Sequence, residues 1–326
     1  MKLQNIKHKL AGEETGAALV MVALLMVAML GFSAFVVDFG MAYVEVSRLQ
    51  NALDSAALAA VQELPSKDKS AAVSVAIEFA SANGYTIDAS NIVFDSKGEG
   101  AAERYTGITL TSQIDVKYFL APLIGVGTGP VQRTASSEVE TLGGLSGLVP
   151  LCITSEDLAY VIAESKTEDI TLKFDASKDF EFLLSGDVPG WYGAVRFPGD
   201  SGATDYKHNL ADGYGDVVSV GDIIAAEHGV MTGPTKSAFN ERFDRCTHGG
   251  CTVDNYVEGC PRIVFMPVIE LVDGKDFKVV GFVSFILEPS SGGKIVGSYL
   301  REITVSGSTS EEAADDYGVY VGKLIN

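Results

Sequence analysis

The chain has 326 residues and a formal net charge of −19, and 47% of its residues are hydrophobic. Residues 1–60 are nearly neutral, with four Lys or Arg against five Asp or Glu, so the acidic excess belongs to the remainder. Such an acidic body lacks the basic clusters that bind nucleic acid or anionic lipid surfaces, which argues against both as partners of the body. The apolar content is sufficient for one or two packed cores.

The first element is an unbroken run of 21 uncharged residues at 17–37. About 20 apolar residues, at a rise of ~1.5 Å each, cross the ~30 Å hydrocarbon core of a bilayer, so the run predicts a transmembrane helix. It is longer than the apolar core of a signal peptide, and no small-x-small cleavage site follows it. A buried helix of a soluble protein is the alternative, which the length of the run disfavours.

The charges on either side of this run predict its orientation. Lys2, Lys7 and Lys9 precede it, whereas the first basic residue after it is Arg48. Positive residues beside a membrane helix stay in the cytoplasm, and acidic residues have little influence. We therefore expect residues 1–16 in the cytoplasm, residues 17–37 in contact with membrane lipid, and the C-terminal body outside the membrane.

Helical periodicity continues beyond the run to residue 63. Apolar residues recur three or four positions apart, which places them on one stripe of a helix: Ala42, Val46, Leu49, Leu53, Ala56 and Ala60. Pro65 ends the pattern. We expect one helix over residues 17–64, about 70 Å long at ~1.5 Å per residue. Its alanine-rich outer half would allow close packing against its own body or a neighbour.

Residues 65–142 are predicted to form a small α+β unit. A helix is expected over 69–83, with Gly84 as its C-terminal cap. Alternating and β-branched residues predict strands at 91–95, 104–119 and 131–140, with a turn rich in Gly and Pro at 122–130. Gly143, Gly144 and Gly147 then indicate a hinge or domain boundary.

Residues 143–326 are predicted to form a β-rich extracytoplasmic domain of sandwich or barrel type. Turn residues separate short apolar strands at 148–153, 170–174, 180–186, 216–224, 262–272, 277–289, 299–305 and 319–325. Helical periodicity is scarce, with one or two turns expected at 238–245. The predicted fold class is α+β: a long N-terminal transmembrane helix, a small α+β unit and a β-rich domain.

The N-terminal segment carries a set of motifs in a fixed order. Gly-Ala precedes the span, Val-Asp-x-Gly-x-x-Tyr follows it, and Leu-Gln-x-Ala-x-Asp then leads into an alanine-rich stretch. The residues concerned are Gly16, Asp38, Gly40, Tyr43, Leu49, Gln50, Asn51, Ala52, Asp54, Ala56 and Ala57. In this order and spacing they resemble the membrane anchor of TadE/TadG-like Flp (Tad) pilus-assembly proteins, over about residues 16–61. The resemblance implies a bacterial cell envelope and a role in assembling an appendage.

One position departs from the pilin-like members of this group. Prepilins and TadE/TadF pseudopilins are cleaved after a glycine and carry a glutamate at the fifth position beyond the cut. Here the candidate glycine is Gly16 and the fifth residue after it is Met21. The resemblance is therefore closer to the uncleaved, TadG-like type, and we expect the N-terminal segment to be retained.

Four cysteines lie in the part of the chain predicted to be outside, where disulfides are permitted: Cys152, Cys246, Cys251 and Cys260. Four cysteines allow three pairings. Cys246 and Cys251 enclose a short loop, and Cys152 and Cys260 both border apolar strands. A zinc site of Cys246, His248, Cys251 and Cys260 is a weaker alternative, since its spacing lacks paired C-x2-C knuckles. Free buried thiols are the third possibility.

Other candidate sites are weaker. The body's histidines, His208, His228 and His248, and the serines at 201, 219 and 237 lie outside any G-x-S-x-G, H-E-x-x-H, P-loop or G-x-G-x-x-G pattern. Asp200, Asp205, Asp212, Asp216 and Asp222 crowd one Gly-rich stretch, which favours turns over a Ca²⁺ site. We expect Trp191 and Tyr192 to be buried in the core, and an exposed binding patch is the less favoured alternative.

These patterns predict a protein that is not an enzyme, with no catalytic residue and no cofactor. We expect a membrane-anchored structural or assembly component of a Tad/Flp-type pilus or envelope appendage in the bacterial cytoplasmic membrane. It would act through contacts with other pilus or envelope proteins. The alternatives are a surface adhesin or ligand-binding module and a membrane-tethered hydrolase. The oligomeric state stays open.

Overall fold

The structure is a computed structural model. It describes residues 3–66, 68–98, 103–164, 171–175, 191–228, 231–253, 255–257, 259–273, 275–288, 294–300, 303–309 and 316–325.

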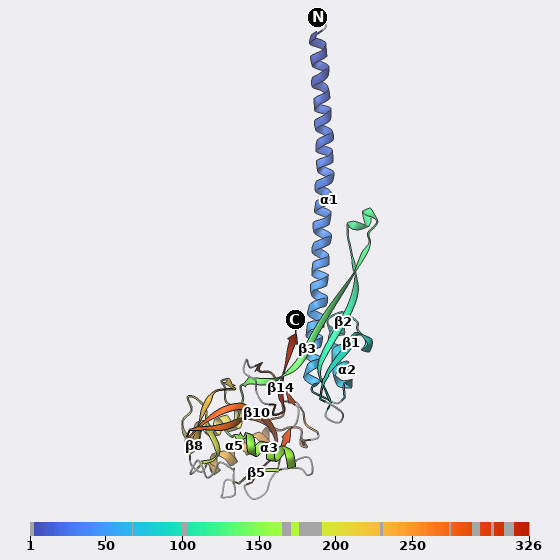
Figure 1. Cartoon of the computed structure of the whole chain (residues 1–326). Helices are drawn as coiled ribbons and strands as arrows, with labels where there is room; N and C mark the ends of the chain where they lie inside the picture. Colours follow the sequence, from blue (N-terminus) through green and yellow to red (C-terminus); the bar gives the residue numbers. More distant parts are fainter. Residues whose placement is uncertain are drawn as a thin grey trace.

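The N-terminal element is a single helix, α1 (Leu3–Ala60), of 58 residues. It projects from the rest of the molecule as a long rod (Figure 1). Its apolar stretch has a mean hydropathy of 2.7 and is wholly unburied, so the helix is long and apolar enough to cross a membrane. A short 3-10 turn, η1 (Val61–Glu63), follows it. The helix is continuous through the apolar run, and it ends at Ala60, four residues before the predicted end at residue 64.

The lower end of α1 packs against a small α+β unit. This unit contains α2 (Ser70–Ala82), the 3-10 turn η2 (Ala89–Asn91), and the strands β1 (Ile92–Lys97), β2 (Arg104–Lys117) and β3 (Thr128–Leu145). The strands are antiparallel, with Ile92 opposite Leu110 and Leu110 opposite Ala135. Gly84 ends α2 with a φ of 87°, which suits the predicted glycine cap.

The stripe predicted on α1 forms the core between the helix and this sheet. Leu49, Leu53, Ala56 and Ala60 are fully buried there, together with Ala72, Ala76 and Ala80 of α2. Small residues on both helices let the two backbones approach closely. The outer half of α1 is therefore held by its own body.

The C-terminal strand returns to this first sheet. β14 (Val319–Ile325) pairs antiparallel with β3, and β12 (Ile303–Thr304) pairs parallel with β14. β7 (Val218–Ser219) and β13 (Ser308–Thr309) also pair with β3. The boundary expected at residue 143 lies inside β3, and the end of the chain lies back beside α1 (Figure 1).

A second sheet forms the distal part of the molecule. Its order is β4 (Ile153–Thr154), β9 (Ile263–Asp273), β10 (Asp276–Glu288), β11 (Lys294–Leu300) and β5 (Thr171–Asp175). β8 (Ile223–His228) pairs with β10 and with β6 (Trp191–Arg196). The strand expected at 180–186 lies outside the described residues. The predicted α+β class with a β-rich distal part is confirmed.

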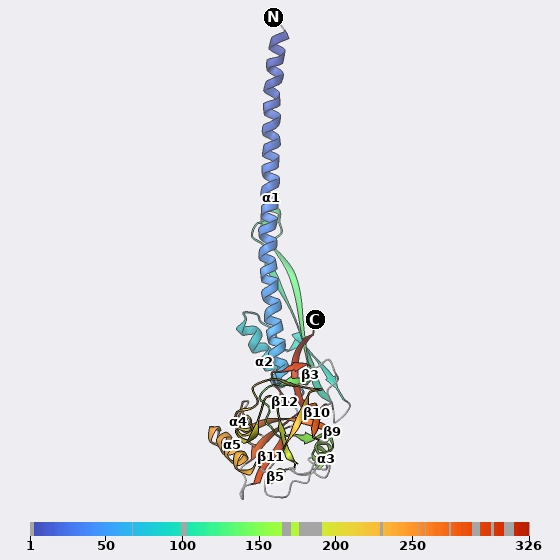
Figure 2. The ribbon, with the colours of Figure 1, turned by 90° about the vertical axis from the view of Figure 1, so that its left-hand side faces the viewer.

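This distal part holds more helix than the sequence suggested. α3 (Ser155–Glu164), α4 (Gly202–Asp212) and α5 (Thr232–Arg245) are present, and α4 and α5 pack together at one side of the sheet (Figure 2). α4 lies in the Asp- and Gly-rich stretch that was expected to form turns. Its helical signal is weak because Tyr206 and Leu210 provide most of its apolar face. Tertiary packing therefore decides its structure.

Candidate functional site

Asp38 is the first charged residue after the apolar run and lies on α1 beside the tip of the β2–β3 hairpin. Its carboxylate accepts hydrogen bonds from the amides of Phe119 at 2.7 Å, Leu120 at 2.9 and 3.0 Å, and Ala121 at 2.6 Å. Asp38 is only 6% exposed. The three amides open the 3-10 turn η4 (Ala121–Ile124), whose first N–H groups lack partners within the turn. The acid therefore caps a turn formed by a segment about 80 residues away.

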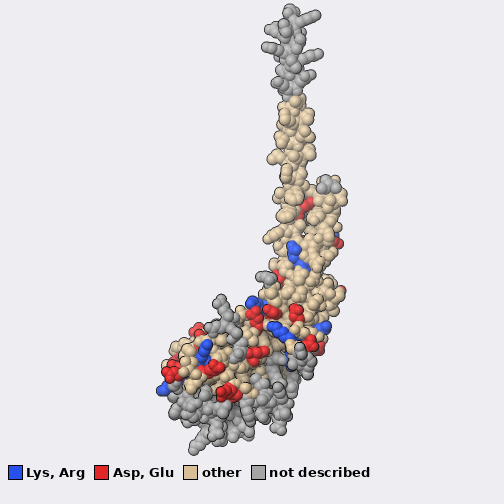
Figure 3. Space-filling view, in the orientation of Figure 1, with Lys and Arg blue, Asp and Glu red and all other residues tan. Residues whose placement is uncertain are grey.

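The hairpin tip extends along the apolar part of α1. Leu120, Leu123 and Val126 of the tip line an open groove together with Val27, Leu30, Gly31 and Ala34 of the helix. Phe119 is 68% exposed and Leu123 is 84% exposed. The segment between Lys117 and Arg133 carries no charged residue. In Figure 3 the charged side chains gather on the body, while the described upper helix is almost free of them. The tip therefore matches the apolar span in chemistry as well as in position.

The second half of the motif fixes α1 to the sheet. Gln50 donates hydrogen bonds to Asp54 Oδ1 at 2.8 Å, one helical turn away, and to the carbonyl of Thr134 in β3 at 3.1 Å. The apolar motif residues Leu49, Ala52, Ala56 and Ala57 are buried. The Leu-Gln-x-Ala-x-Asp motif thus provides the residues of α1 that pack against the body.

Three further motif residues lie on a part of α1 that the body leaves open; Gly40 lines a groove with Tyr85 and Lys117, and Tyr43 lines the groove at the hairpin tip. Gly40, Tyr43 and Asn51 are exposed, and Tyr43 is 67% exposed. Their spacing of three and then eight residues places them on one side of a helix. A Cβ at Gly40 would meet nothing within 4 Å, and the same holds for Gly16. Among the described residues, no close neighbour therefore requires a glycine at position 16 or at position 40.

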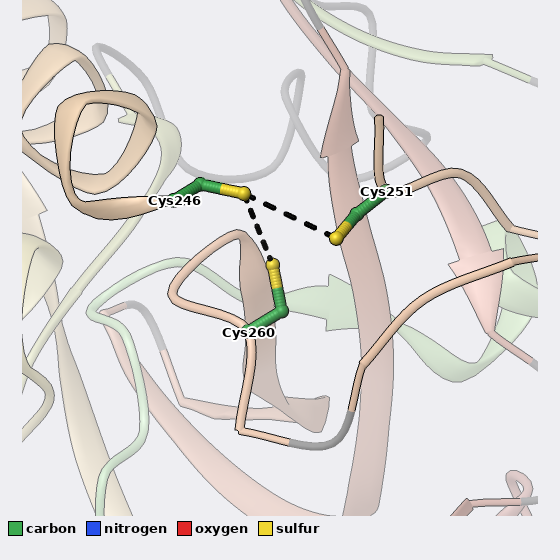
Figure 4. A group of neighbouring side chains, drawn as sticks. All are labelled: Cys246, Cys251 and Cys260. Carbon is green, nitrogen blue, oxygen red and sulfur yellow. Dashed lines mark hydrogen bonds between the residues drawn. The ribbon is translucent and has the colours of Figure 1, made fainter. Parts of the chain in front are cut away.

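The structure joins none of the four cysteines in a disulfide, and it separates them into two places. Cys152 is buried in the distal core, and its Sγ donates to the carbonyl of Gly193 at 3.4 Å. Cys246, Cys251 and Cys260 lie together, with all three Sγ atoms within 4.8 Å of one another (Figure 4). His248 is exposed and is not part of this group. The structure thus brings together three of the four residues proposed for a zinc site and places Cys152 elsewhere.

The environments of these thiols differ. Burial raises the pKa of Cys260 to about 11. Burial also raises the pKa of Cys246, but hydrogen bonds with Cys260, the His248 amide, Cys251 and Arg262 outweigh this effect, so the pKa of Cys246 lies below its usual value. Burial, with a smaller contribution from Asp157, raises the pKa of Cys152 well above the usual value.

The other candidate residues have local structural roles where they are described. His208 pairs with Asp212 at 3.2 Å, and Asp212 also pairs with Arg245. The Ser237 hydroxyl donates to Glu241. Among the described side chains, no serine is hydrogen-bonded to a histidine. The side chains of His228, Trp191 and Tyr192 lie outside the described residues.

The aspartates of residues 200–222 also have separate partners. Asp200 accepts from the Asn209 side chain, Asp205 from the Ser201 amide and Asp222 from the Ser219 amide. The first two bonds join residues within or beside helix α4, and the third closes a turn at residues 219–222.

Sequence reasoning missed two features of these sites. It did not place a partner on Asp38, because the amides that the acid binds carry no side-chain signal. It also gave no role to Arg242 and Arg262, which are buried near the three clustered cysteines. The position of Arg262, two residues after Cys260, was the signal in the sequence that could have placed this arginine beside the cysteines.

Comparison with known proteins identifies the N-terminal segment. Residues 16–63 match the protein family described as Flp pilus-assembly TadE/G-like. No curated protein and no solved structure matches the chain. The family match covers the helix from the glycine before the span to the end of η1. The chain therefore carries a TadE/G-like domain, and this domain supports a role related to Flp pilus assembly.

Proposed function

We propose that this protein is a membrane-anchored structural component of a Tad/Flp-type pilus assembly apparatus, acting through protein–protein contacts. The observation that carries the proposal is the extent of the TadE/G-like match, residues 16–63. This match covers both halves of α1, the unburied apolar half and the half buried beneath the body. One helix thus provides the membrane anchor and the attachment of the outer body.

The proposed topology is a single pass with the N-terminus inside. Lys2, Lys7 and Lys9 precede the span, and the acidic body follows it. The exposed apolar side chains of the upper helix support membrane burial, because a soluble protein rarely leaves such a surface in water.

The hairpin tip provides a second contact with the membrane in this arrangement. It lines a groove with Leu30 of α1, which precedes Asp38 by eight residues, or about 12 Å along a helix. If Asp38 marks the outer boundary of the hydrocarbon region, the tip enters the outer leaflet. The exposed Phe119 and Leu123 fit such a place, and the capped amides avoid unsatisfied backbone groups in lipid. Two contacts with the membrane would fix the tilt of the body.

The proposed partner site is the exposed part of α1 that carries Gly40, Tyr43 and Asn51. Gly40, Tyr43 and Asn51 are exposed, and Gly40 permits close helix approach. The proposed partner is another helix of the same anchor type, from a pilus-assembly protein in the same membrane.

Photo-crosslinking in cells tests this assignment. A photoreactive phenylalanine analogue at Tyr43 is expected to give an adduct with another pilus-assembly protein, identified by mass spectrometry. The matched control is the same analogue at Val93, which is 61% exposed on β1, a strand that pairs with β2. If position 43 yields no protein adduct, or only those seen from position 93, the proposed partner face is wrong. Normal piliation in a deletion strain would overturn the assembly role itself.

A further inference from the structure

Three thiols converge in the distal part of the body. Cys246 Sγ lies 3.6 Å from Cys260 Sγ and 4.0 Å from Cys251 Sγ. A tetrahedral zinc ion with Zn–S bonds of ~2.3 Å holds its sulfur ligands about 3.8 Å apart. The observed separations are close to this value and far from the ~2.05 Å of a disulfide bond. We propose that Cys246, Cys251 and Cys260 bind one Zn²⁺ ion, which crosslinks this part of the chain.

The place of the cluster in the chain gives such an ion a structural task. Cys246 follows the end of α5, Cys251 lies in the next loop, and Cys260 precedes β9. Residues 246–262 join α5 to β9, and their described part contains only one isolated bridge, between Thr252 and Asn255. A connection of this length without regular structure is uncommon in a compact domain. Three metal bonds would fix it at both ends and in the middle.

The cluster is set in an apolar environment that favours thiolate ligands over water. Cys251 and Cys260 are buried, and Ile263, Ile286 and Leu300 pack around them. Cys246 is half-buried and leaves the cluster open on one side. The site is therefore anchored in the core and accessible to an entering ion.

Backbone groups already orient two of the sulfur atoms. Cys246 accepts a hydrogen bond from the amide of His248, and Cys260 accepts one from the amide of Arg262. Both donors lie two residues after the cysteine. Amide donors of this kind stabilise a thiolate and orient it, as outer-shell groups do in metal sites.

Buried positive charge matches the charge of the proposed complex. Three thiolates around Zn²⁺ carry a net charge of −1, and the thiol protons pass to solvent on binding. The Arg262 guanidinium bonds to Cys246 and to the carbonyl of Leu287 at 2.8 Å, and lies over the Phe243 ring. The Arg242 guanidinium donates to the carbonyl of Pro261 at 2.7 Å. Both cations are placed beside the anionic site.

The fourth ligand in this proposal is solvent. His248 is exposed, and its imidazole is not gathered with the three sulfur atoms. A disulfide would join only two of the three thiols, and it would not explain why the third cysteine lies next to them. Cys152 is not available as its partner, because it is buried in another core.

Metal analysis of the full chain purified in detergent tests the proposal. About one zinc ion per chain is expected, and a chelator is expected to lower the melting temperature whereas a reductant alone is not. Cys246→Ser and Cys260→Ser should lose the ion. His248→Ala and Cys152→Ser are the matched controls and should keep it. Loss of zinc from His248→Ala would overturn the assignment of solvent as the fourth ligand.

A measurement on the unaltered chain tests the proposal even if the variants do not fold. Replacing the metal with Co²⁺ should give the intense near-ultraviolet absorption of thiolate-to-cobalt charge transfer. The proposal is overturned if the unaltered chain neither contains zinc nor takes up Zn²⁺ or Co²⁺ under reducing conditions. A disulfide between two of the three cysteines in the native, untreated protein would overturn it as well.

Discussion

The carboxylate of Asp38 accepts a hydrogen bond of 2.6 Å from the amide of Ala121, 83 residues further along the chain. Leu120 and Phe119 donate to the same carboxylate. These bonds join the end of the apolar run to the tip of the longest hairpin in the described structure. Asp38 is thus the first polar residue after the membrane span and also the residue that holds the hairpin tip against α1.

Removing this carboxylate should release the hairpin tip. Asp38→Ala leaves three amides without their acceptor, and unpaired backbone donors in a shielded place are unfavourable. We expect the amides of residues 119–121 to exchange hydrogen about tenfold faster or more in nanodiscs. Mass spectrometry of hydrogen exchange measures this on the full chain.

Asp115→Ala is the control for the same experiment. Asp115 lies on β2 of the same hairpin and is exposed. Its removal changes the charge equally but should leave exchange at residues 119–121 unchanged. Equal exchange in the unaltered chain and Asp38→Ala would show that these hydrogen bonds do not hold the tip.

The position of the tip in lipid can be tested by fluorescence quenching. The chain has a single tryptophan, Trp191, so Trp191→Phe provides a silent background. Leu123→Trp in this background should be quenched strongly by brominated lipid chains, because the side chain is 84% exposed beside the apolar span. Val93→Trp on β1 is the control and should not be quenched. Equal quenching at the two positions would place the tip outside the hydrocarbon region.

The long helix and its contacts could be predicted because their signals are local. An uncharged run and a stripe with helical spacing are properties of neighbouring residues. Leu49, Leu53, Ala56 and Ala60 lie in the core as the periodicity predicts. The capping role of Gly84 is equally local, since it depends on the backbone freedom of one residue.

The remaining features depend on contacts between distant residues. Nothing near Asp38 identifies the Leu120 amide as its partner, and nothing in β14 specifies that it pairs with β3. The three clustered cysteines are near one another in sequence, yet their convergence depends on how α5 and β9 are placed. Cysteine spacing alone left disulfide, metal and free thiol open, because it does not determine the distances between the sulfur atoms.

Cys152 should be inert to alkylation while the protein is folded. Burial raises the pKa of its thiol well above the usual value, so little thiolate forms near pH 8. We expect iodoacetamide to modify Cys152 in denaturant but not in the native protein, as measured by peptide mass spectrometry. Comparable modification in both states would show that this thiol is not held in the core.

The same shift predicts a pH dependence of stability. In the unfolded chain the thiol ionises near pH 8.5, whereas in the folded chain it stays protonated to higher pH. The contribution of Cys152 to stability is therefore fully present below about pH 8.5 and is lost as pH rises above it. Urea unfolding at pH 7.5 and pH 10 should show a smaller loss for Cys152→Ala than for the unaltered chain. An equal loss of stability in both proteins would show that Cys152 does not cause the pH dependence.

The orientation of the chain can be tested with protease. The lysines before the span and the acidic body after it predict that the body is outside the cytoplasmic membrane. Protease added to intact cells without their outer layers should remove the body and leave a small membrane-bound fragment containing residues 17–37. A cytoplasmic protein in the same cells serves as the control for lysis and should stay intact. If the body is cleaved only after the cells are broken, the topology is the reverse, and the acidic body with its hairpin lies in the cytoplasm.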